Sequence, residues 1–400
     1  RQQCAVFTFS ASNLKRSTEL EGGFQFIPKK KDSLGSMNIL DAAFGETHSA
    51  FLTGNGEIYT LGQGPYKKGP MLQGVVQVPD EVKDALAALT LRDGTRVVQL
   101  GASGGYFRSA MSMLTNDGQL FMCTEELFWH DAAQGVACGV LEAHGESGQL
   151  FKVLPSKYAL QIAHDFHHSA MLVRDPESDG DINNTEVYTW GRGSKGQLCH
   201  GSDENEPLPR QVAGFSGKRV VELAVGEDHT VALTRDGKVY ACGSNVYGQL
   251  GNGRDLAPYC AVPRLVQALA DVRVIQIATG KFNTLALSDE GEVFTWGRAL
   301  DVAMEAEHGV VCDFNPRRVD LLARWRVVQV AAREFQSVAL TSDGEVFTWG
   351  LGRGARLCDC DHDCKDCALV GNRYKVPRRV RALVGKRVVR VSTGEFDTAA

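Results

Sequence analysis

The sequence predicts an all-β fold, a seven-bladed β-propeller that forms one domain over residues 1 to 400. Three observations predict it. The hexapeptide EVFTWG occurs at Glu292 and again at Glu345, 53 positions later. Related stretches recur along the whole chain, and two-residue glycine turns precede most of them. A period of this length indicates repeated structural units that bury their apolar faces against one another.

The last position of each EVFTWG-like stretch measures the period. The marks are Ser10, Gly62, Thr124, Gly191, Gly243, Gly297 and Gly350, with spacings of 52, 62, 67, 52, 54 and 53 residues. Each interval is too short for an ordinary domain. Seven marks therefore predict seven blades, and Trp190, Trp296 and Trp349 are interpreted as blade core because they share one repeat position.

Short turns precede the marks. Asp236-Gly237, Asp343-Gly344 and Glu290-Gly291 each join two alternating apolar runs. Such turns favour β-hairpins, since only residues that tolerate positive φ match the twist of the flanking strands. Each unit thus contains a hairpin.

A Val/Ile-rich run comes before each hairpin and ends in a turn of the form Gly, two variable residues, then often His, then Ser or Thr. Leu223 to Leu233, LAVGEDHTVAL, is an example. The expected repeat units are residues 40–80, 96–155, 158–213, 219–266, 273–319, 326–380, and 387–400 completed by 1–30.

The two ends of the chain complement each other. Residues 387–400 contain the first run of a unit without its second hairpin strand, and residues 3–10, QCAVFTFS, supply such a strand. Radial stacking that closes on itself removes exposed sheet edges. We therefore expect the N-terminal and C-terminal strands to pair and close the ring.

Composition limits the classes of function. The net charge is -5, so a large non-specific contact with nucleic acid is not expected. The eleven cysteines and the absence of an eighteen-residue apolar run predict a non-membrane protein of the cytoplasm or nucleus, and a monomer is expected. No set of side chains predicts covalent catalysis.

The repeat resembles a known family. The order Gly-x-x-His-Ser/Thr, Asp-Gly-x-Val-Tyr/Phe-x-Trp-Gly and Gly-x-Leu-Gly is similar to the regulator of chromosome condensation (RCC1) repeat. The family's founding member is a seven-bladed propeller that exchanges guanine nucleotide on the small GTPase Ran. The resemblance covers essentially the whole chain and implies the fold more than the function, because such propellers also serve as ligase-associated modules and scaffolds.

In this family the Gly-x-x-His turns form a rosette at one rim. Carried over by position, the rosette comprises Glu46, His48, Tyr106, Arg108, His167, His168, Asp228, His229, Lys281, Asn283, Glu334, Gln336, Glu395 and Asp397. The fourth residue of each turn either contacts a partner or only bonds the backbone of a neighbouring blade. The residue before it varies in charge, which is typical of a partner-contacting loop on a rigid scaffold.

A long insertion follows the third mark, from Thr124 to Gln149. In the Ran exchange factor the corresponding blade carries a β-wedge that presses on the GTPase. The resemblance implies that Phe128, Trp129 and Glu142 contact a partner. Alternatively, the insertion only fills a blade that lacks the usual Trp-Gly.

A cysteine cluster occupies the loop after the sixth hairpin. Cys358, Cys360, Cys364 and Cys367 fall within ten residues. Four thiolates can hold a structural zinc ion, although this spacing is not that of a common zinc knuckle. A free cysteine-rich loop and a local disulfide remain alternatives, and no cofactor is required by the fold.

The expected function is protein binding through the rosette rim and the third-blade insertion. The alternative is guanine nucleotide exchange on a Ran-like small GTPase, which would require tighter binding to the nucleotide-free GTPase. The acidic positions used by the exchange factor are Phe107 and His167 here, which argues against exchange. No basic tail is visible, so contact with chromatin is not expected. An enzyme with a metal at the cysteine loop is a third class.

Overall fold

A computed structural model describes most of the repeated part of the chain. The described residues are 7–10, 29–30, 39–44, 48–54, 57–62, 75–77, 94–105, 108–124, 130–131, 136–137, 150–153, 157–165, 167–174, 184–254, 257–298, 312–333, 336–351, 373–380, 383–393 and 397–399.

Six four-stranded antiparallel sheets follow one another along the chain, and each is named here by its first strand. The β3 blade has β3 (Ile39–Phe44), β4 (His48–Thr53), β5 (Ile58–Gly62) and β6 (Val75–Gln77); the β7 blade has β7 (Val97–Gly105), β8 (Arg108–Thr115), β9 (Leu120–Thr124) and β12 (Leu150–Val153); the β13 blade has β13 (Tyr158–His164), β14 (His168–Arg174), β15 (Thr185–Gly191) and β16 (Glu206–Gln211). The β17 blade has β17 (Val220–Val225), β18 (His229–Thr234), β19 (Val239–Ser244) and β20 (Tyr259–Leu265); the β21 blade has β21 (Val274–Thr279), β22 (Asn283–Ser288), β23 (Val293–Arg298) and β24 (Cys312–Arg318); the β25 blade has β25 (Val327–Arg333), β26 (Gln336–Thr341), β27 (Val346–Leu351) and β28 (Arg373–Arg379).

The remaining strands form two further sheets. One combines both ends of the chain in the order β2 (Lys29–Lys30), β1 (Phe7–Ser10), β30 (Asp397–Ala399) and β29 (Ser392–Thr393). The other is the short ladder of β10 (His130–Asp131) and β11 (Val136–Ala137), within the insertion. Three 3₁₀ turns precede first strands: η2 (Ala213–Phe215), η3 (Gln267–Leu269) and η4 (Asp320–Leu322).

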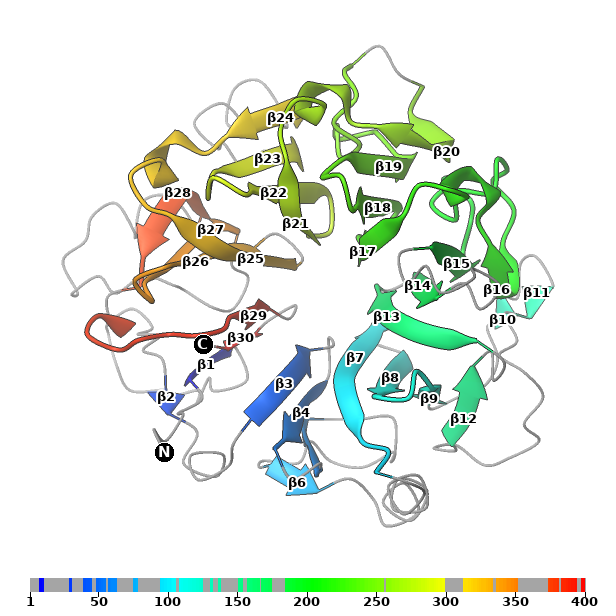
Figure 1. Ribbon diagram of the computed structural model, residues 1–400, viewed down its shortest axis with the longest axis horizontal. Coiled ribbons are helices and arrows are strands. Elements are labelled where there is room, and N and C mark those ends of the chain that lie inside the picture. Colours follow the sequence, from blue (N-terminus) through cyan, green and yellow to red (C-terminus); the bar gives the residue numbers. More distant parts are fainter. Residues whose placement is uncertain are drawn as a thin grey trace, which may run out of the picture.

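The blades radiate from a central opening, with the first strand of each blade innermost (Figure 1). The prediction of an all-β propeller is confirmed. Among the described residues, no helix has both the length and the hydropathy needed to cross a bilayer.

The hairpin turn of the β17 blade shows how the sequence builds a blade. Thr234 donates its backbone N–H to the carbonyl of Lys238 at 2.9 Å, and its hydroxyl donates to Asp236 at 2.5 Å. Gly237 lies between them at φ +81°. Because this conformation is strained for residues with a Cβ, the Asp-Gly pair fixes the register of β18 and β19.

The hydrophobic core lies between blades. One buried cluster joins Val231 of the β17 blade to Ile277 and Trp296 of the β21 blade, and another joins Leu285 of the β21 blade to Trp349 of the β25 blade. The β21 sheet therefore buries its two faces against two neighbours. The interpretation of Trp190, Trp296 and Trp349 as blade core is confirmed, since all three are buried.

The first strands share a β-bulge. In the β17 blade the register with β18 shifts between Val220 and Glu222, which leaves Val221 without a partner, and the other five blades shift at the equivalent position. The residue after the bulge reaches the next blade. Gln329, for example, donates to the carbonyl of Val391 and accepts its N–H, both at 2.9 Å.

Two further links cross between blades. Cys199, after β15, and Cys242, on β19, form a disulfide with their Cα atoms 5.7 Å apart. Arg333, at the end of β25, lies 3.7 Å from the carboxylate of Asp165, after β13, and donates to the carbonyl of His164 at 3.5 Å. Since β13 and β25 are three blades apart, this ion pair spans the central opening at one end.

Candidate functional site: the turn rim

The turns between first and second strands define one rim of the propeller, called the turn rim here. In the β17 blade the turn starts at Gly226, whose N–H donates to the carbonyl of His229 at 2.9 Å. A Cβ on Gly226 would lie 2.1 Å from Cε1 of His229 and 2.7 Å from the carbonyl of Gly280. Only glycine therefore allows the imidazole to fold back over the turn.

The end of the third strand supports the same turn. Ser244 donates its N–H to the carbonyl of Asp228 at 2.8 Å. Gly243, at φ +110°, precedes it, and a Cβ there would lie 2.3 Å from that carbonyl. The two recurring glycines of the sequence thus hold residues 227 and 228 in a fixed position.

His229 is a buried link to the next blade. Its Nε2 lies 3.1 Å from the hydroxyl of Thr284, and that hydroxyl donates to the carbonyl of Gln249 at 3.0 Å. Because the hydroxyl proton of Thr284 is donated to Gln249, the Thr284 oxygen accepts the bond from His229. Nε2 of His229 is therefore protonated and donates. Burial lowers the pKa of His229 to about 3, so the ring is neutral.

His168 repeats this arrangement one blade earlier. Its Nε2 lies 2.8 Å from the hydroxyl of Thr230, which donates to the carbonyl of Gln197. Burial, followed by the neighbouring histidines, lowers the pKa of His168 to about 3. Asn283 points the same way and reaches the hydroxyl of Ser337 at 3.5 Å. These three rosette residues bond side chains of the next blade.

In each turn, the two residues before the fourth position make up the accessible part of the turn rim. Glu227 lies between His167 Nε2, at 3.8 Å, and Lys281 Nζ, at 3.3 Å. Burial opposes its ionisation, but the polar contact with His167 and the charge of Lys281 outweigh it and hold the pKa of Glu227 below its usual value. Glu227 is therefore an ionised bridge across three blades.

Asp228 differs from its neighbour. Burial, and then the charge of Glu227, raise the pKa of Asp228, while Arg192 and Lys195 offset the shift only in part. Its Oδ1 accepts a long hydrogen bond of 3.3 Å from the amide of Gln197. The carboxyl of Asp228 is thus half-buried on the rim and weakly compensated.

An aromatic pair extends the turn rim toward the β21 blade. The rings of Tyr247 and Phe282 are 4.7 Å apart between centroids. Lys281 Nζ lies 5.5 Å from the centroid of Phe282, and the guanidinium of Arg298 lies 5.5 Å from that of Tyr247. Aromatic rings flanked by cations are typical anchors at protein interfaces.

The structure places the predicted site residues in three groups. Side chains are described for His167, His168, Asp228, His229, Lys281, Asn283 and Gln336, and all seven lie at the turn rim. His48, Arg108 and Asp397 start β4, β8 and β30, but only their backbone is described. Glu46, Tyr106, Glu334, Glu395, Phe128, Trp129, Glu142, Cys358, Cys360, Cys364 and Cys367 lie outside the described residues.

Sequence reasoning missed the aromatic pair and the interblade partners of the histidines. Tyr247 belongs to a glycine-rich loop that the repeat pattern treats as a turn. Thr230 and Thr284 directly follow the fourth position of their turns, one repeat after His168 and His229. This recurrence was the signal in the sequence for the interblade partners. Within the part of the chain that the structure describes, no group of three or more metal-ligating side chains is arranged to hold a metal ion.

Comparison with known proteins identifies the repeat. The regulator of chromosome condensation (RCC1) repeat matches residues 185–233, 236–287 and 343–400, and a second version of the same repeat matches residues 220–249. These matches include the turns that carry Asp228 and His229.

Curated relatives are similar over much of the chain. The mouse E3 ubiquitin-protein ligase HERC2 is 28% identical over 99% of this chain, and the chain spans 8% of its length. The ultraviolet-B receptor UVR8 of Arabidopsis thaliana is 33% identical over 60% of this chain and 50% of its own length. The chain therefore covers only part of each of these relatives.

Solved structures share the fold. Prp20p from Saccharomyces cerevisiae, studied for its binding to Gsp1p and histones, superposes with a TM-score of 0.75 at 20% identity, covering 100% of this chain and 91% of its own. Human WBSCR16 gives a TM-score of 0.72 at 20% identity, covering 99% of this chain and 98% of its own. With the repeats, the fold and the glycine-held turn rim in agreement, this chain is a β-propeller that carries RCC1 repeats.

Proposed function

We propose that the chain binds a protein partner through the turn rim, and that Asp228 is its central polar contact. The observation that carries the proposal is the contrast between two adjacent carboxylates. Glu227 is ionised between His167 and Lys281, whereas Asp228 is half-buried with a raised pKa. A basic donor from a partner would complete the environment of Asp228, and the rigid turn limits the entropy lost on binding.

The surface around Asp228 also supports the proposal. The aromatic pair Tyr247 and Phe282 supplies apolar contact area beside it. In the same proposal, Glu46, Glu334 and Glu395 extend the acidic character around the rim, because they occupy the turn position of Glu227. The buried His168 and His229 position these turns, since their side chains are used between blades.

Affinity capture followed by measurement of binding by the purified partner tests the proposal. Asp228→Asn removes the charge and keeps the size of the side chain, and we expect at least a tenfold loss of affinity. Asp289→Asn is the matched control. Asp289 is exposed in the β22–β23 hairpin turn of the β21 blade, at the end of the blade opposite the turn rim. Equal affinities of the two variants would refute the assignment of the turn rim.

A finer proposal is guanine nucleotide exchange on a Ran-like small GTPase. The fold likeness to Prp20p supports it, as does the β10–β11 ladder, which gives the insertion the antiparallel form expected of a wedge. Phe107 and His167 stand where the exchange factor has acidic residues, so Asp228 and Glu227 would have to supply the acidity. Trp129 and Phe128 would contact the GTPase.

Release of labelled GDP from Ran separates the two functions. An exchange factor would raise the release rate by two orders of magnitude or more, and Trp129→Ala and Asp228→Asn would each lower it. A binding propeller would leave the rate unchanged while still retaining its partner. An unchanged rate would remove the exchange proposal and leave the binding proposal intact.

We further propose that the sheet of β2, β1, β30 and β29 closes the ring as a seventh blade. The pairing of Thr8 with Ala399 and of Ser10 with Asp397 supports this closure. A structural zinc ion held by Cys358, Cys360, Cys364 and Cys367 stays a proposal as well. Metal analysis of the purified protein, with Cys364→Ser as the comparison, would test it.

A further inference from the structure

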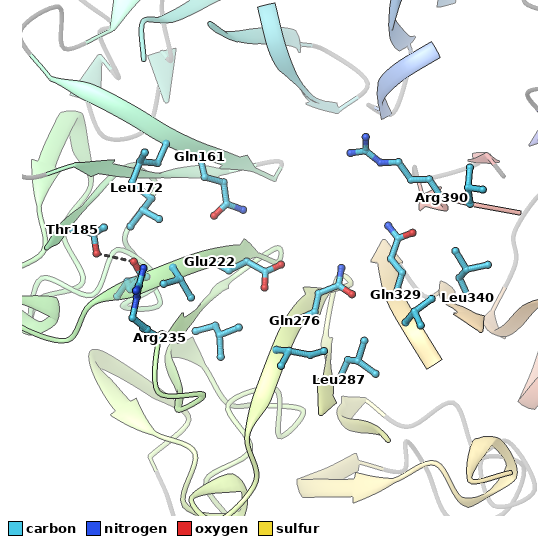
Figure 2. A pocket seen from close by; sticks show the side chains of 17 residues that line it. Gln161, Leu172, Thr185, Glu222, Arg235, Gln276, Leu287, Gln329, Leu340 and Arg390 are labelled. Atoms are coloured by element: carbon cyan, nitrogen blue, oxygen red, sulfur yellow. Dashed lines mark hydrogen bonds between the residues drawn. The ribbon is translucent and has the colours of Figure 1, made fainter. Parts of the chain in front are cut away.

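The centre of the propeller contains a cavity of about 770 Å³. The residues that line it come largely from the beginnings of the first strands, so the cavity lies toward the end opposite the turn rim. At the turn rim the opening is spanned by Arg333 and Asp165. Figure 2 shows side chains of four first strands and Arg390 converging on this space.

Apolar side chains at one repeat position form a collar, and five of them line the cavity: Leu160, Val221, Ile275, Val328 and Val389. The residue left unpaired by each β-bulge is Leu, Val or Ile in all six blades, and Val389 precedes β29 at the equivalent place. Six of these seven collar residues are exposed, by 42% to 74%: Leu40, Val98, Val221, Ile275, Val328 and Val389; the seventh is Leu160. A ring of exposed aliphatic residues marks a site for apolar contact.

A polar ring follows one residue further along each strand. Glutamine occupies it in four blades, as Gln99, Gln161, Gln276 and Gln329, and Asp41 occupies it in the β3 blade. Gln161, Gln276 and Gln329 are used for bonds to the next blade. Glu222 occupies it in the β17 blade. One of its carboxyl oxygens accepts the N–H of Ile277 at 3.1 Å, and the other has no partner among the described residues.

Arg235 and Arg390 also line the cavity, but neither cation contributes to the pKa shift of Glu222. The neighbours of Glu222 on β13 and β21 are the neutral Gln161 and Gln276. Arg390 donates to Asp41 and to the carbonyl of Leu40, each at 2.6 Å, so its charge is directed to the β3 blade. Burial raises the pKa of Glu222 to about 7.

We propose that the central cavity binds a lysine side chain presented by a peptide segment of a partner protein, with the aliphatic stem against the collar and the ammonium group on Glu222. The arrangement of apolar collar and single carboxyl matches the two parts of this side chain. The remaining volume accommodates the segment that carries the lysine. This site lies at the other end of the propeller from the turn rim and is independent of the proposed function.

The geometry favours lysine over arginine. A guanidinium pairs best with both oxygens of a carboxylate, but Ile277 already occupies one oxygen of Glu222. An ammonium group needs only one oxygen, and it can also reach the carbonyl oxygens of the neighbouring glutamine side chains. Anionic ligands are disfavoured because they would face Glu222.

Three acetylated, amidated pentapeptides test the proposal: Ac-Gly-Leu-X-Leu-Gly-NH₂ with X as lysine, norleucine or glutamate. Binding is followed by NMR of protein labelled with ¹³C at the glutamate carboxyls, and the Glu222 signal is assigned by its loss in Glu222→Gln. This substitution is well suited as a control, because glutamine is the residue at the same place in four other blades.

The lysine peptide should bind at least tenfold more tightly than the norleucine peptide, shift the Glu222 carboxyl signal and lower the pKa of Glu222. The preference should vanish in Glu222→Gln, whose folding is checked by thermal unfolding. Equal binding of lysine and norleucine, stronger binding of the glutamate peptide, or no binding of any peptide at millimolar concentration would each overturn the proposal. Val328→Ser, which weakens the collar, should reduce the binding of both the lysine and norleucine peptides.

Discussion

Gln161 and Leu223 are joined by two hydrogen bonds across a blade boundary. The amide of Gln161 donates to the carbonyl of Leu223 at 3.0 Å, and the N–H of Leu223 donates to the Gln161 oxygen at 2.8 Å. One blade further, the carboxyl of Glu222 makes only the bond from Ile277 N–H. An ionised carboxylate has no proton to donate to the facing carbonyl, so this boundary has one hydrogen bond fewer.

We expect Glu222→Gln to stabilise the protein at pH 8 by about 1–2 kcal/mol, because the amide can donate the missing bond and removes a buried charge. Burial raises the folded-state pKa of Glu222 to about 7 from 4.5. The contribution of protonated Glu222 to the free energy of unfolding is therefore fully present below pH 4.5 and is lost as the pH rises through 7.

Urea unfolding at a series of pH values measures this difference. The gap between variant and wild type should open between pH 4.5 and 7 and stay constant above. Gln276→Glu, the reverse change in the next blade, should destabilise the protein at pH 8. A constant gap across the whole range would show that the charge of Glu222 is not the cause.

The buried histidines should make the protein sensitive to acid. His229 and His168 have folded-state pKa values of about 3, well below the 6.5 of an exposed histidine. Stability is therefore fully present above pH 6.5 and is lost as the pH falls toward 3. At pH 5 the loss is up to about 2 kcal/mol for each histidine.

His229→Asn tests this linkage, since asparagine occupies the equivalent position at Asn283. The variant should lose about 1 kcal/mol at pH 7.5, where the bond to Thr284 is missing, and should show a shallower loss between pH 6.5 and 5. Unfolding midpoints at four pH values are sufficient. Parallel profiles for variant and wild type would contradict the prediction.

Gly226→Ala should destabilise the protein by about 2–3 kcal/mol, because the new methyl group would overlap the ring of His229 and the carbonyl of Gly280. Gly217→Ala is the control. Gly217 has φ +71°, and a Cβ added there would have no atom within 4 Å. Its replacement therefore reports backbone strain alone, about 1 kcal/mol. Thermal unfolding of both variants would measure the steric part, and equal losses would rule it out.

Arg333→Gln should cost about 2–3 kcal/mol, since it leaves the buried carboxylate of Asp165 without this cation. The double variant Asp165→Asn with Arg333→Gln should recover part of the loss. A double-mutant cycle of urea unfolding gives the coupling between the two residues. Strictly additive losses would mean that the ion pair across the opening contributes nothing.

The fold followed from the sequence because the glycine turns and the Trp-Gly marks recur in register. The glycines report backbone conformations, such as φ +110° at Gly243, that few other residues adopt. The site was predicted less completely. The position of Asp228 on the rim came from the repeat, but the raised pKa of its carboxyl depends on burial and on the charge of Glu227.

The polar ring illustrates what the sequence already contained. Gln99, Gln161, Gln276 and Gln329 occupy one repeat position, and Glu222 and Asp41 replace glutamine there. Alignment of the units by their bulges gives Glu222 and Asp41 as the two acidic residues at this position, but the positions of the bulges became known only from the strand pairing. The need for three-dimensional neighbours explains why the cavity could not be predicted.

The position of the core between the sheets has a consequence for the integrity of the repeat. Val231 and Trp296 belong to different sequence repeats but to one buried cluster. A single repeat cut from the chain would expose both of its faces and retain no complete core. Limited proteolysis should therefore yield fragments that stay associated, and a unit excised at its sequence boundaries should not fold alone.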